Sequence, residues 1–348
     1  MSKNVFSRAP CRLSFGGGGT ELSPYVDTRG GVVLNATIAI YAYCNLNKLN
    51  ENSVIFESSD MRLKEKYSVD EIMNMEAKAS NLPLHLGVYQ YICKEYLNNE
   101  TCPISLITHT DAPVGSGLGA SSTMTVAIIK AFDEYLSLGL GEYELAKIAY
   151  YVERVYLNLN GGRQDQYAAA FGGFNYMEFF ADDKVIINPL RVKKDYINNL
   201  ELNLLLYYSG KSRESANIIE NQTMLLESGD KSIYKELDFI KSLAPKMKNS
   251  ILTNSIIDFA ELLNESWEHK KNTSSSITTR EIDNIYSTAI ENGALAGKVS
   301  GAGGGGFILF IVPISNRTKV IDAIENSTDQ GVFFPCVFTE YGAESWSL

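Results

Sequence analysis

The chain has 348 residues, of which 45% are hydrophobic and 21% are charged, and this composition is typical of a folded globular protein. Its formal net charge is -10, which disfavours binding to nucleic acids or to anionic membrane surfaces. The sequence has no apolar run of the ~20 residues that a membrane-spanning helix needs. Residues 1–12 contain no apolar run of the kind found in a secretory signal, and the 5 cysteines are scattered without a metal-binding spacing. We therefore expect a cytoplasmic protein of about two domains.

The first of three glycine clusters, residues 16–19, lies between two predicted strands. Residues 9–15 and 31–41 are alternating or β-branched, as is typical of strands. Runs of glycine cost backbone entropy, so such a cluster indicates a place where the backbone must approach another group closely. Loop flexibility would explain any one cluster taken alone.

The second cluster, residues 115–119, follows an apolar strand at 104–107 and precedes a helix predicted for 124–136. The N-terminus of a helix presents unpaired N–H groups and the positive end of a dipole, so this strand–loop–helix unit predicts an anion site. It is not a Walker A loop, because it contains no lysine. It is not a dinucleotide-binding loop either, because Asp133 and Glu134 lie within the helix and not at the end of a second strand.

Two acidic residues follow the anion site: Glu153 on a helix predicted for 142–157, and Asp165 in the turn 161–167. Taken singly, Glu153 is explained as a solvated helix carboxylate and Asp165 as a helix cap. Beside a phosphate loop, however, two carboxylates are what phosphoryl transfer requires. One helps to hold Mg²⁺, and the other orients or deprotonates the acceptor hydroxyl.

The second half of the chain contains a helix predicted for 279–292, with a capping box at Thr278 and Glu281. The third glycine cluster, residues 301–306, follows this helix and precedes a strand at 307–312. Polar residues at 182–184 interrupt two strand-like runs, and we place the domain boundary there. The pattern predicts an α+β protein with domains at 1–180 and 181–348.

Three segments of the chain, in order and over essentially its full length, resemble the motifs of the GHMP kinases (the galacto-, homoserine, mevalonate and phosphomevalonate kinases). They are RAPCRL at 8–13, PVGSGLGASST at 113–123 and KVSGAGGGGF at 298–307, with Ala120 where many members carry serine. Within the family, the chain is most similar to the sugar kinases that act on a heptose 7-phosphate. The similar segments are FGGGGTE at 15–21, LNATI at 34–38, GGRQDQY at 161–167 with GGFN at 172–175, and SGKSRESA at 209–216, with Arg163 in place of a lysine.

The resemblance implies a ribosomal-S5-like domain followed by a ferredoxin-like domain, with ATP and Mg²⁺ as cofactors and a small-molecule sugar phosphate as substrate. Asp165 would act on the acceptor hydroxyl with Arg12 beside it, and Ser121, favoured over Ser122, would bind the metal together with Glu153. One loop would cradle the ATP phosphates: Pro113, Gly115, Ser116, Gly117, Leu118, Gly119, Ala120, Ser121 and Ser122. Substrate contacts are expected from Gly18, Thr20, Glu21, Arg163, Ser212, Arg213, Gly303 and Gly304.

The reaction that the resemblance implies is ATP-dependent phosphorylation of the anomeric C1 hydroxyl of a heptose 7-phosphate, giving the 1,7-bisphosphate. Two alternatives stay open: an L-fucose-type sugar-1-kinase that takes an unphosphorylated sugar, and a non-catalytic sensor of nucleotide and sugar. Asp165 favours the enzyme, since such sensors typically lose this acidic residue. The oligomeric state stays open, and no nucleic-acid or membrane partner is expected.

Overall fold

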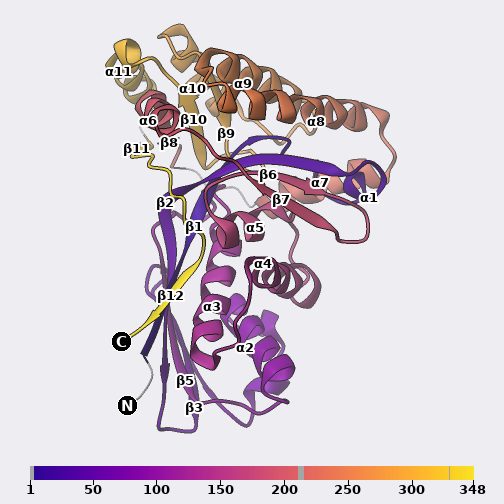
Figure 1. Ribbon diagram of the computed structural model, residues 1–348, viewed down its shortest axis with the longest axis vertical. Helices are drawn as coiled ribbons and strands as arrows, with labels where there is room; N and C mark the ends of the chain where they lie inside the picture. Colours follow the sequence, from indigo (N-terminus) through magenta and orange to yellow (C-terminus); the bar gives the residue numbers. More distant parts are fainter. Residues whose placement is uncertain (1–3, 211–214, 329) are drawn as a thin grey trace.

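The computed structural model describes residues 4–210, 215–328 and 330–348 (Figure 1). Its larger sheet has 8 strands in the order β12-β1-β2-β5-β3-β4, with β6 paired to β2 and β7 paired to β6. The bounds are β1 (Asn4–Gly16), β2 (Gly31–Lys48), β3 (Ser53–Ser58), β4 (Leu63–Ser68), β5 (Ile104–Thr110), β6 (Phe174–Phe179), β7 (Val185–Pro189) and β12 (Glu344–Ser347).

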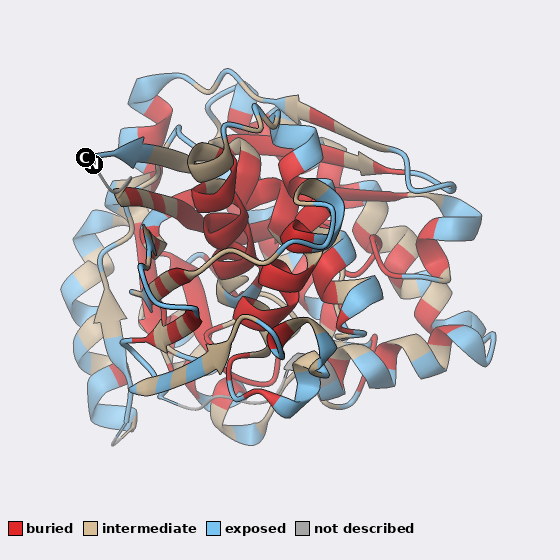
Figure 2. Cartoon of the chain, turned by 90° about the horizontal axis from the view of Figure 1, so that it is seen from below, coloured by how far each residue is buried: buried red, intermediate tan, exposed pale blue. Residues whose placement is uncertain are grey.

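Helices cover one face of the larger sheet, with α3 packed directly on β1 and β2 (Figure 1). Phe56 of β3, Tyr89 of α2 and Phe132 of α3 share the core beneath them. Figure 2 shows buried residues in the interior of the molecule and exposed residues around its periphery. The elements of this layer are η1 (Ile72–Asn74), η2 (Ala77–Ala79), α2 (Pro83–Tyr96), α3 (Ala120–Leu136), α4 (Glu142–Tyr150), the π-helical η3 (Tyr151–Tyr156) and α5 (Gln164–Phe171).

The smaller sheet has 4 antiparallel strands in the order β11-β8-β10-β9. All residues of β10 are buried, because α10 and α11 pack on one face of the sheet and α8 and α9 on the other. The strands are β8 (Leu204–Tyr208), β9 (Ala296–Val299), β10 (Phe307–Ile311) and β11 (Val332–Phe334). The remaining helices are α1 (Tyr25–Arg29), α6 (Lys194–Asn203), α7 (Ser215–Glu227), α8 (Lys231–Leu252), α9 (Ile256–Lys271), α10 (Arg280–Glu291), η4 (Ile314–Asn316) and α11 (Arg317–Ser327).

The two sheets share a hydrophobic core. Leu13 and Phe15 of β1 lie in one cluster with Met247 of α8 and Phe259 of α9, and the rings of Phe15 and Phe259 meet edge to face at 5.4 Å. The segment between β6 and β7 is a hairpin turn within the larger sheet, and β12, near the end of the chain, returns to pair with β1. The α+β prediction is confirmed, whereas a division at residue 180 stays a prediction.

The predicted helices are present with shifted ends. α3 begins at Ala120, earlier than predicted, and the segment expected as one helix from 142 to 157 is α-helical only to Tyr150 and π-helical beyond it. The cap of α10 is Thr279, whose hydroxyl accepts from the N–H of Ile282, so the prediction of Thr278 as cap is wrong by one residue. In the described part of the chain, no helix is long and apolar enough to span a membrane.

Candidate active site

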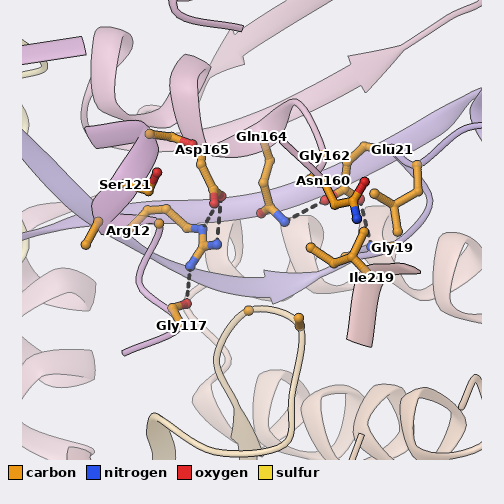
Figure 3. Close-up of a pocket in the computed structure, with 18 of the residues that line it drawn as sticks. Arg12, Gly19, Glu21, Gly117, Ser121, Asn160, Gly162, Gln164, Asp165 and Ile219 are labelled. Atoms are coloured by element: carbon orange, nitrogen blue, oxygen red, sulfur yellow. Dashed lines mark hydrogen bonds and ion pairs between the residues drawn. The ribbon is translucent and has the colours of Figure 1, made fainter. Parts of the chain in front are cut away.

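A cavity of about 400 Å³ lies where the first turn of the chain, the start of α3 and the start of α5 meet (Figure 3). One end, which we term the loop end, is formed by residues 115–117 and 119–122 with Gly301 and Ala302. The other, the polar end, is formed by Gly18, Gly19, Glu21, Gln164 and Lys270. Arg12 and Asp165 line the cavity as well, and in Figure 3 they lie between Ser121 and Gln164.

The loop end is made of two glycine clusters whose backbones touch. Gly117 has a φ of +76°, and a Cβ on it would lie 2.5 Å from the carbonyl oxygen of Ser300. A Cβ on Gly301 would lie 2.6 Å from the carbonyl oxygen of Gly117 in return. The N–H of Phe307 donates to the carbonyl of Ser116 at 2.9 Å. Only glycine permits this approach, so the second and third clusters form a single rigid unit.

The N-terminus of α3 opens on this unit. Gly119 is the N-cap in a left-handed conformation and supplies no side-chain cap, and Ala120, Ser121 and Ser122 of the first turn line the cavity. Uncapped N–H groups of the first turn of a long helix hold an anion well, since they are donors at the positive end of the helix dipole. Leu118, by contrast, is fully buried in the core and its carbonyl accepts from the N–H of Arg12 at 3.2 Å. Neither Leu118 nor Pro113 lines the cavity.

Glu153 and Ser121 meet beside the loop end. The Ser121 hydroxyl donates to Glu153 Oε1 at 3.0 Å, and Gln166 Nε2 donates to Glu153 Oε2 at 2.6 Å and also to the Ser122 hydroxyl at 3.0 Å. Glu153 is fully buried, and the nearest cation, Arg154, is 3.9 Å away. A buried carboxylate and a hydroxyl beside a phosphate loop suit Mg²⁺, which takes one or two protein ligands and completes its shell with phosphates and water.

No group of three or more His, Cys, Asp or Glu side chains that could hold a metal occurs in residues 4–210, 215–328 and 330–348.

Asp165 and Arg12 form an ion pair in the middle of the cavity. Arg12 Nε and Nη2 approach Asp165 Oδ1 at 2.8 and 2.7 Å, and Arg12 Nη1 donates to the carbonyl of Gly117 at 2.7 Å. Asp165 Oδ2 has no hydrogen-bond partner among the described residues, and a Cβ on Gly119 would lie 3.0 Å from it. Arg12 thus ties the carboxylate to the loop end and leaves one of its oxygens to a substrate.

The polar end is built from buried side chains. Glu21 Oε2 accepts from the N–H of Gly19 at 2.7 Å, and Glu21 Oε1 accepts from Gln164 Nε2 at 2.6 Å. Burial raises the pKa of Glu21 above its usual value, against the opposing effects of nearby backbone N–H groups and Lys270. Lys270 of α9 donates to the carbonyl of Gly18 at 3.2 Å, and burial lowers the pKa of its ammonium group, against the opposing effect of Glu21.

Several residues expected to bind substrate have other partners. Thr20 is buried outside the cavity lining, and its hydroxyl donates to the carbonyls of Gly17 and Val32. Arg163 bonds Asp183 at 2.6 Å and lies over the ring of Tyr150, away from the cavity. Gly303 and Gly304 pack against Ile277, whose carbonyl accepts from the N–H of Gly304 at 2.8 Å. Ser212 and Arg213 lie outside the described residues.

Among the lining or supporting residues absent from the prediction, four make polar contacts in the site: Gln164, Gln166, Arg154 and Lys270. Gln164 and Gln166 directly flank Asp165 in the sequence, and this position beside a predicted catalytic residue could have marked them as site residues. Arg154 directly follows Glu153, and its guanidinium packs against Gly161. A Cβ on Gly161 would lie 2.4 Å from Cζ of Arg154. This contact explains the glycine at 161. Lys270 offered no local signal.

Comparison with known proteins agrees with this geometry. Residues 83–173 match the GHMP kinases N terminal domain, and residues 243–329 match the GHMP kinases C terminal model. The chain is 40% identical over 346 residues to the D-glycero-alpha-D-manno-heptose 7-phosphate kinase of Campylobacter jejuni, a match that covers 99% of this chain and 100% of the relative. It is 25% identical over 334 residues to the L-fucokinase/L-fucose-1-P guanylyltransferase of Bacteroides fragilis, covering 88% of this chain and 34% of that protein.

Among solved structures, the crystal structure of a D-glycero-D-manno-heptose 1-phosphate kinase from Bacteroides thetaiotaomicron has a TM-score of 0.81 at 39% identity and covers 99% of each chain. The crystal structure of a mevalonate kinase from Methanococcus jannaschii has a TM-score of 0.74 at 20% identity, covering 96% of this chain and 98% of that one. The matched domains, the full-length relative and the shared fold together confirm the resemblance found in the sequence: the chain belongs to the GHMP kinases and is an ATP-dependent phosphotransferase.

Proposed function

We propose that the protein transfers the γ-phosphoryl group of ATP to the anomeric C1 hydroxyl of D-glycero-D-manno-heptose 7-phosphate, giving the 1,7-bisphosphate. The observation that carries this proposal is the ion pair of Asp165 and Arg12, which joins an anion-binding loop to a pocket of buried hydrogen-bonding side chains. The full-length relative from Campylobacter jejuni bears the name of a heptose 7-phosphate kinase. The solved relative from Bacteroides thetaiotaomicron is named a heptose 1-phosphate kinase, so the sugar class agrees while the phosphate position differs.

At the reacting centre, Asp165 Oδ2 accepts the proton of the C1 hydroxyl while the hydroxyl oxygen bonds to the γ-phosphorus. The bond between the γ-phosphorus and the bridging oxygen breaks, and ADP leaves with the electron pair. Arg12 holds Asp165 in place through Oδ1 and brings a positive charge to the site where negative charge accumulates. A hydroxyl at an anomeric carbon is more acidic than an ordinary alcohol, which lowers the demand on this base.

At the loop end, the phosphates of ATP are held by backbone N–H groups of residues 115–122 and by the dipole of α3. Ser121 and Glu153 are the residues that hold Mg²⁺, and Gln166 orients the Glu153 carboxylate. Bound Mg²⁺ supplies neutralisation of the charge on the phosphates.

At the polar end, Lys270 is a cation suited to the second phosphate of the substrate. Its side chain is buried, and it donates to a neutral carbonyl, that of Gly18, at 3.2 Å. Of the other two cations that line the cavity in the described part of the chain, Arg12 is paired with Asp165 and Arg154 bonds the loop carbonyls of residues 159–162. The protein as a whole carries a net charge of -10, so an anionic substrate depends on such local cations.

The test is ATP turnover against a panel of sugars and sugar phosphates, with the position of the new phosphate read by phosphorus NMR. The expected result is a phosphate at C1 of the heptose 7-phosphate and a much lower kcat/KM for the same heptose without its 7-phosphate. Equal kcat/KM for the two sugars would reject the heptose 7-phosphate as the specific substrate and favour a simple sugar-1-kinase. Binding of ATP and sugar without turnover of any panel member would favour the sensor.

A further inference from the structure

Gln164 stands in the first turn of α5, directly before Asp165. Its side chain lines the cavity, and the residue is only 7% exposed. In Figure 3, the side chains of Gln164 and Asp165 lie side by side on one wall, with Gln164 nearer to Glu21. A group bound at Asp165 therefore has Gln164 as its next neighbour along the cavity.

The orientation of the Gln164 amide is fixed by Glu21. Glu21 accepts from the N–H of Gly19 through one carboxylate oxygen and from Gln164 Nε2 through the other. Gln164 Nε2 donates to Glu21 Oε1 at 2.6 Å, so the amide nitrogen faces Glu21 and the amide oxygen faces the other way.

The Gln164 carbonyl oxygen is buried and has no hydrogen-bond partner in the described part of the chain. Leaving a buried acceptor without a donor costs about 1–3 kcal/mol. The two nearby cations bond other groups and not this oxygen: Arg12 bonds Asp165 and the carbonyl of Gly117, and Lys270 bonds the carbonyl of Gly18. The donor for this oxygen must therefore come from water or from a molecule bound in the cavity.

We propose that Gln164 Oε1 accepts a hydrogen bond from the substrate hydroxyl on the carbon next to the one that is phosphorylated, which makes Gln164 a specificity-determining residue. The inference rests on the proposed function, in which the phosphorylated hydroxyl is the one at Asp165. Because Gln164 and Asp165 are neighbours on one wall of the cavity, they contact hydroxyls on neighbouring carbons of one sugar ring. For a sugar phosphorylated at C1 this is the C2 hydroxyl, so the site selects a pyranose with a hydrogen-bond donor at C2.

The alternative is a purely structural role, in which Gln164 does no more than hold Glu21. The two roles differ in one measurable respect. A site built to bind a hydroxyl rejects the analogue that lacks it, because its own polar group is left buried and unpaired. A structural glutamine changes activity toward all sugars by the same factor and leaves the ratio between them unchanged.

The experiment compares kcat/KM for heptose 7-phosphate and its 2-deoxy analogue in the wild type, in Gln164→Met and in Gln222→Met. Methionine is similar in length and cannot accept a comparable hydrogen bond. Gln222 also lines the cavity, but its amide donates to the Thr273 hydroxyl at 2.7 Å, so it serves as the matched glutamine control. We expect the wild type and Gln222→Met to prefer the complete sugar by about 10- to 100-fold. In Gln164→Met, the two sugars should agree within about threefold, mainly because the complete sugar loses its advantage.

A Gln164→Met protein that keeps the wild-type ratio, or a wild type that does not discriminate, would overturn the inference. If Gln164→Met does not fold, the 2-fluoro analogue tests the same point with the wild type alone. Its KM should be as poor as that of the 2-deoxy sugar, because fluorine cannot donate, and a KM equal to that of the complete sugar would also overturn the inference.

Failure of the proposed function gives a different result, namely no turnover of heptose 7-phosphate by the wild type. The same comparison is then made with the sugar that the panel identifies and with its deoxy analogue at the carbon next to the phosphorylated one. The same two ratios then decide the inference for that sugar.

Discussion

The two ends of the cavity are built on different principles. At the loop end, backbone packs on backbone: the carbonyl of Ser300 fills the space of a Cβ on Gly117, and the carbonyl of Gly117 fills that of a Cβ on Gly301. At the polar end, the contacts come from side chains that are buried with their polar groups, notably Glu21, Gln164 and Lys270. In the proposed function, the loop end would bind groups that every nucleotide carries, whereas the polar end would bind groups that distinguish one sugar from another.

This difference teaches where each end can change. Backbone N–H groups recognise only the charge and shape of a ligand, so the same loop serves any substrate that is phosphorylated from the same nucleotide. Side-chain contacts can be exchanged one at a time, because each depends on a few donors and acceptors. Substitutions at the loop end should therefore affect ATP or metal, and substitutions at the polar end should affect the sugar alone.

The largest effect is expected where the two ends meet, at Asp165. Asp165→Asn should lower kcat by about 10² to 10⁴, because the amide cannot take the proton of the acceptor hydroxyl. The KM for ATP should stay near the wild-type value, since no loop contact is removed. Arg12 loses its counter-charge, so rates are measured well below the thermal midpoint. Asp27→Asn, on the exposed face of α1, is the control, and turnover of Asp165→Asn within threefold of wild type would contradict the assigned role.

The next effect isolates the metal at the loop end. Glu153→Gln should raise the Mg²⁺ concentration for half activity by about 10- to 100-fold, because a hard cation prefers an anionic oxygen ligand. Ser121→Ala should act in the same direction but more weakly, since only a neutral hydroxyl is lost. Glu142→Gln, an exposed glutamate at the start of α4, is the matched control. A magnesium titration of Glu153→Gln that overlays the wild-type curve would remove Glu153 from the metal site.

The polar end is tested by Lys270→Met. The KM for heptose 7-phosphate should rise by about 10- to 100-fold, as expected when a charge-assisted hydrogen bond is lost, while the KM for ATP should not move. The dephosphorylated heptose should be equally poor with both proteins. Lys271→Met is the matched control, since that neighbouring lysine bonds Glu268 at 2.8 Å. Arg213, predicted to contact the same phosphate, lies outside the described residues, and Arg213→Ala is tested by the same two KM measurements. If Lys270→Met raised the KM for heptose 7-phosphate and the KM for ATP by the same factor, Lys270 would have no specific contact with the sugar phosphate.

Gly117→Ala tests the backbone cradle directly. A left-handed φ costs a residue with a Cβ about 1–2 kcal/mol, a factor of about 5–30 in an equilibrium, and the contact with the Ser300 carbonyl adds to this cost. We expect the KM for ATP to rise by at least that factor, with little change in the ratio between sugars. Gly139→Ala is the control, because Gly139 has a φ of +73° but nothing within 4 Å of its Cβ position. If the two variants behaved alike, the contact between the glycine clusters would not matter.

The same difference explains how much the sequence could predict. The loop end was predicted because glycines and hydroxyls at a strand–loop–helix junction are typical of an anion site, and Asp165 and Glu153 followed from the chemistry that such a loop serves. Lys270 could not be found, because it reaches Gly18 across 252 positions of chain and α9 carries no pattern that marks it. Tertiary packing alone brings it to the cavity.

Two substrate predictions show the limits of residue type as a guide. Thr20 was expected to bind substrate, yet its hydroxyl holds the turn that presents Gly18 and Glu21. Arg163 directly precedes Gln164, but successive helical positions differ by about 100°, so the arginine points to Asp183 while the glutamine lines the cavity. A cation close in sequence to the reacting centre is therefore a weaker signal than its place on the helix.

The smallest expected effect concerns Lys298, a buried lysine whose charge interacts with Lys270, Arg12 and Glu21. It lies in the third motif, is 6% exposed, and donates to the carbonyl of Phe15 at 3.1 Å. Burial, with Lys270 and Arg12 nearby, lowers the pKa of its ammonium group to about 7. In the unfolded chain the group titrates at about 10.4. Between these values the unfolded chain binds a proton that the folded chain has released, so this group makes the folded state more stable as the pH rises and imposes its full penalty below pH 7.

Lys298→Met removes this pH dependence of stability and also removes the hydrogen bond to Phe15. The two losses act in opposite directions on the free energy of unfolding, so a measurement at one pH cannot test the prediction. The test is how the difference in free energy of unfolding between wild type and variant changes with pH. Above pH 7, the wild type should gain on the variant by up to about 1.4 kcal/mol per pH unit, measured by urea denaturation from pH 6 to pH 9. Lys246→Met, at an exposed lysine of α8, should run parallel to wild type throughout. If the stability of Lys298→Met also ran parallel to that of the wild type, Lys298 would remain charged in the folded protein. The third motif would then place a full positive charge near Lys270 and Arg12.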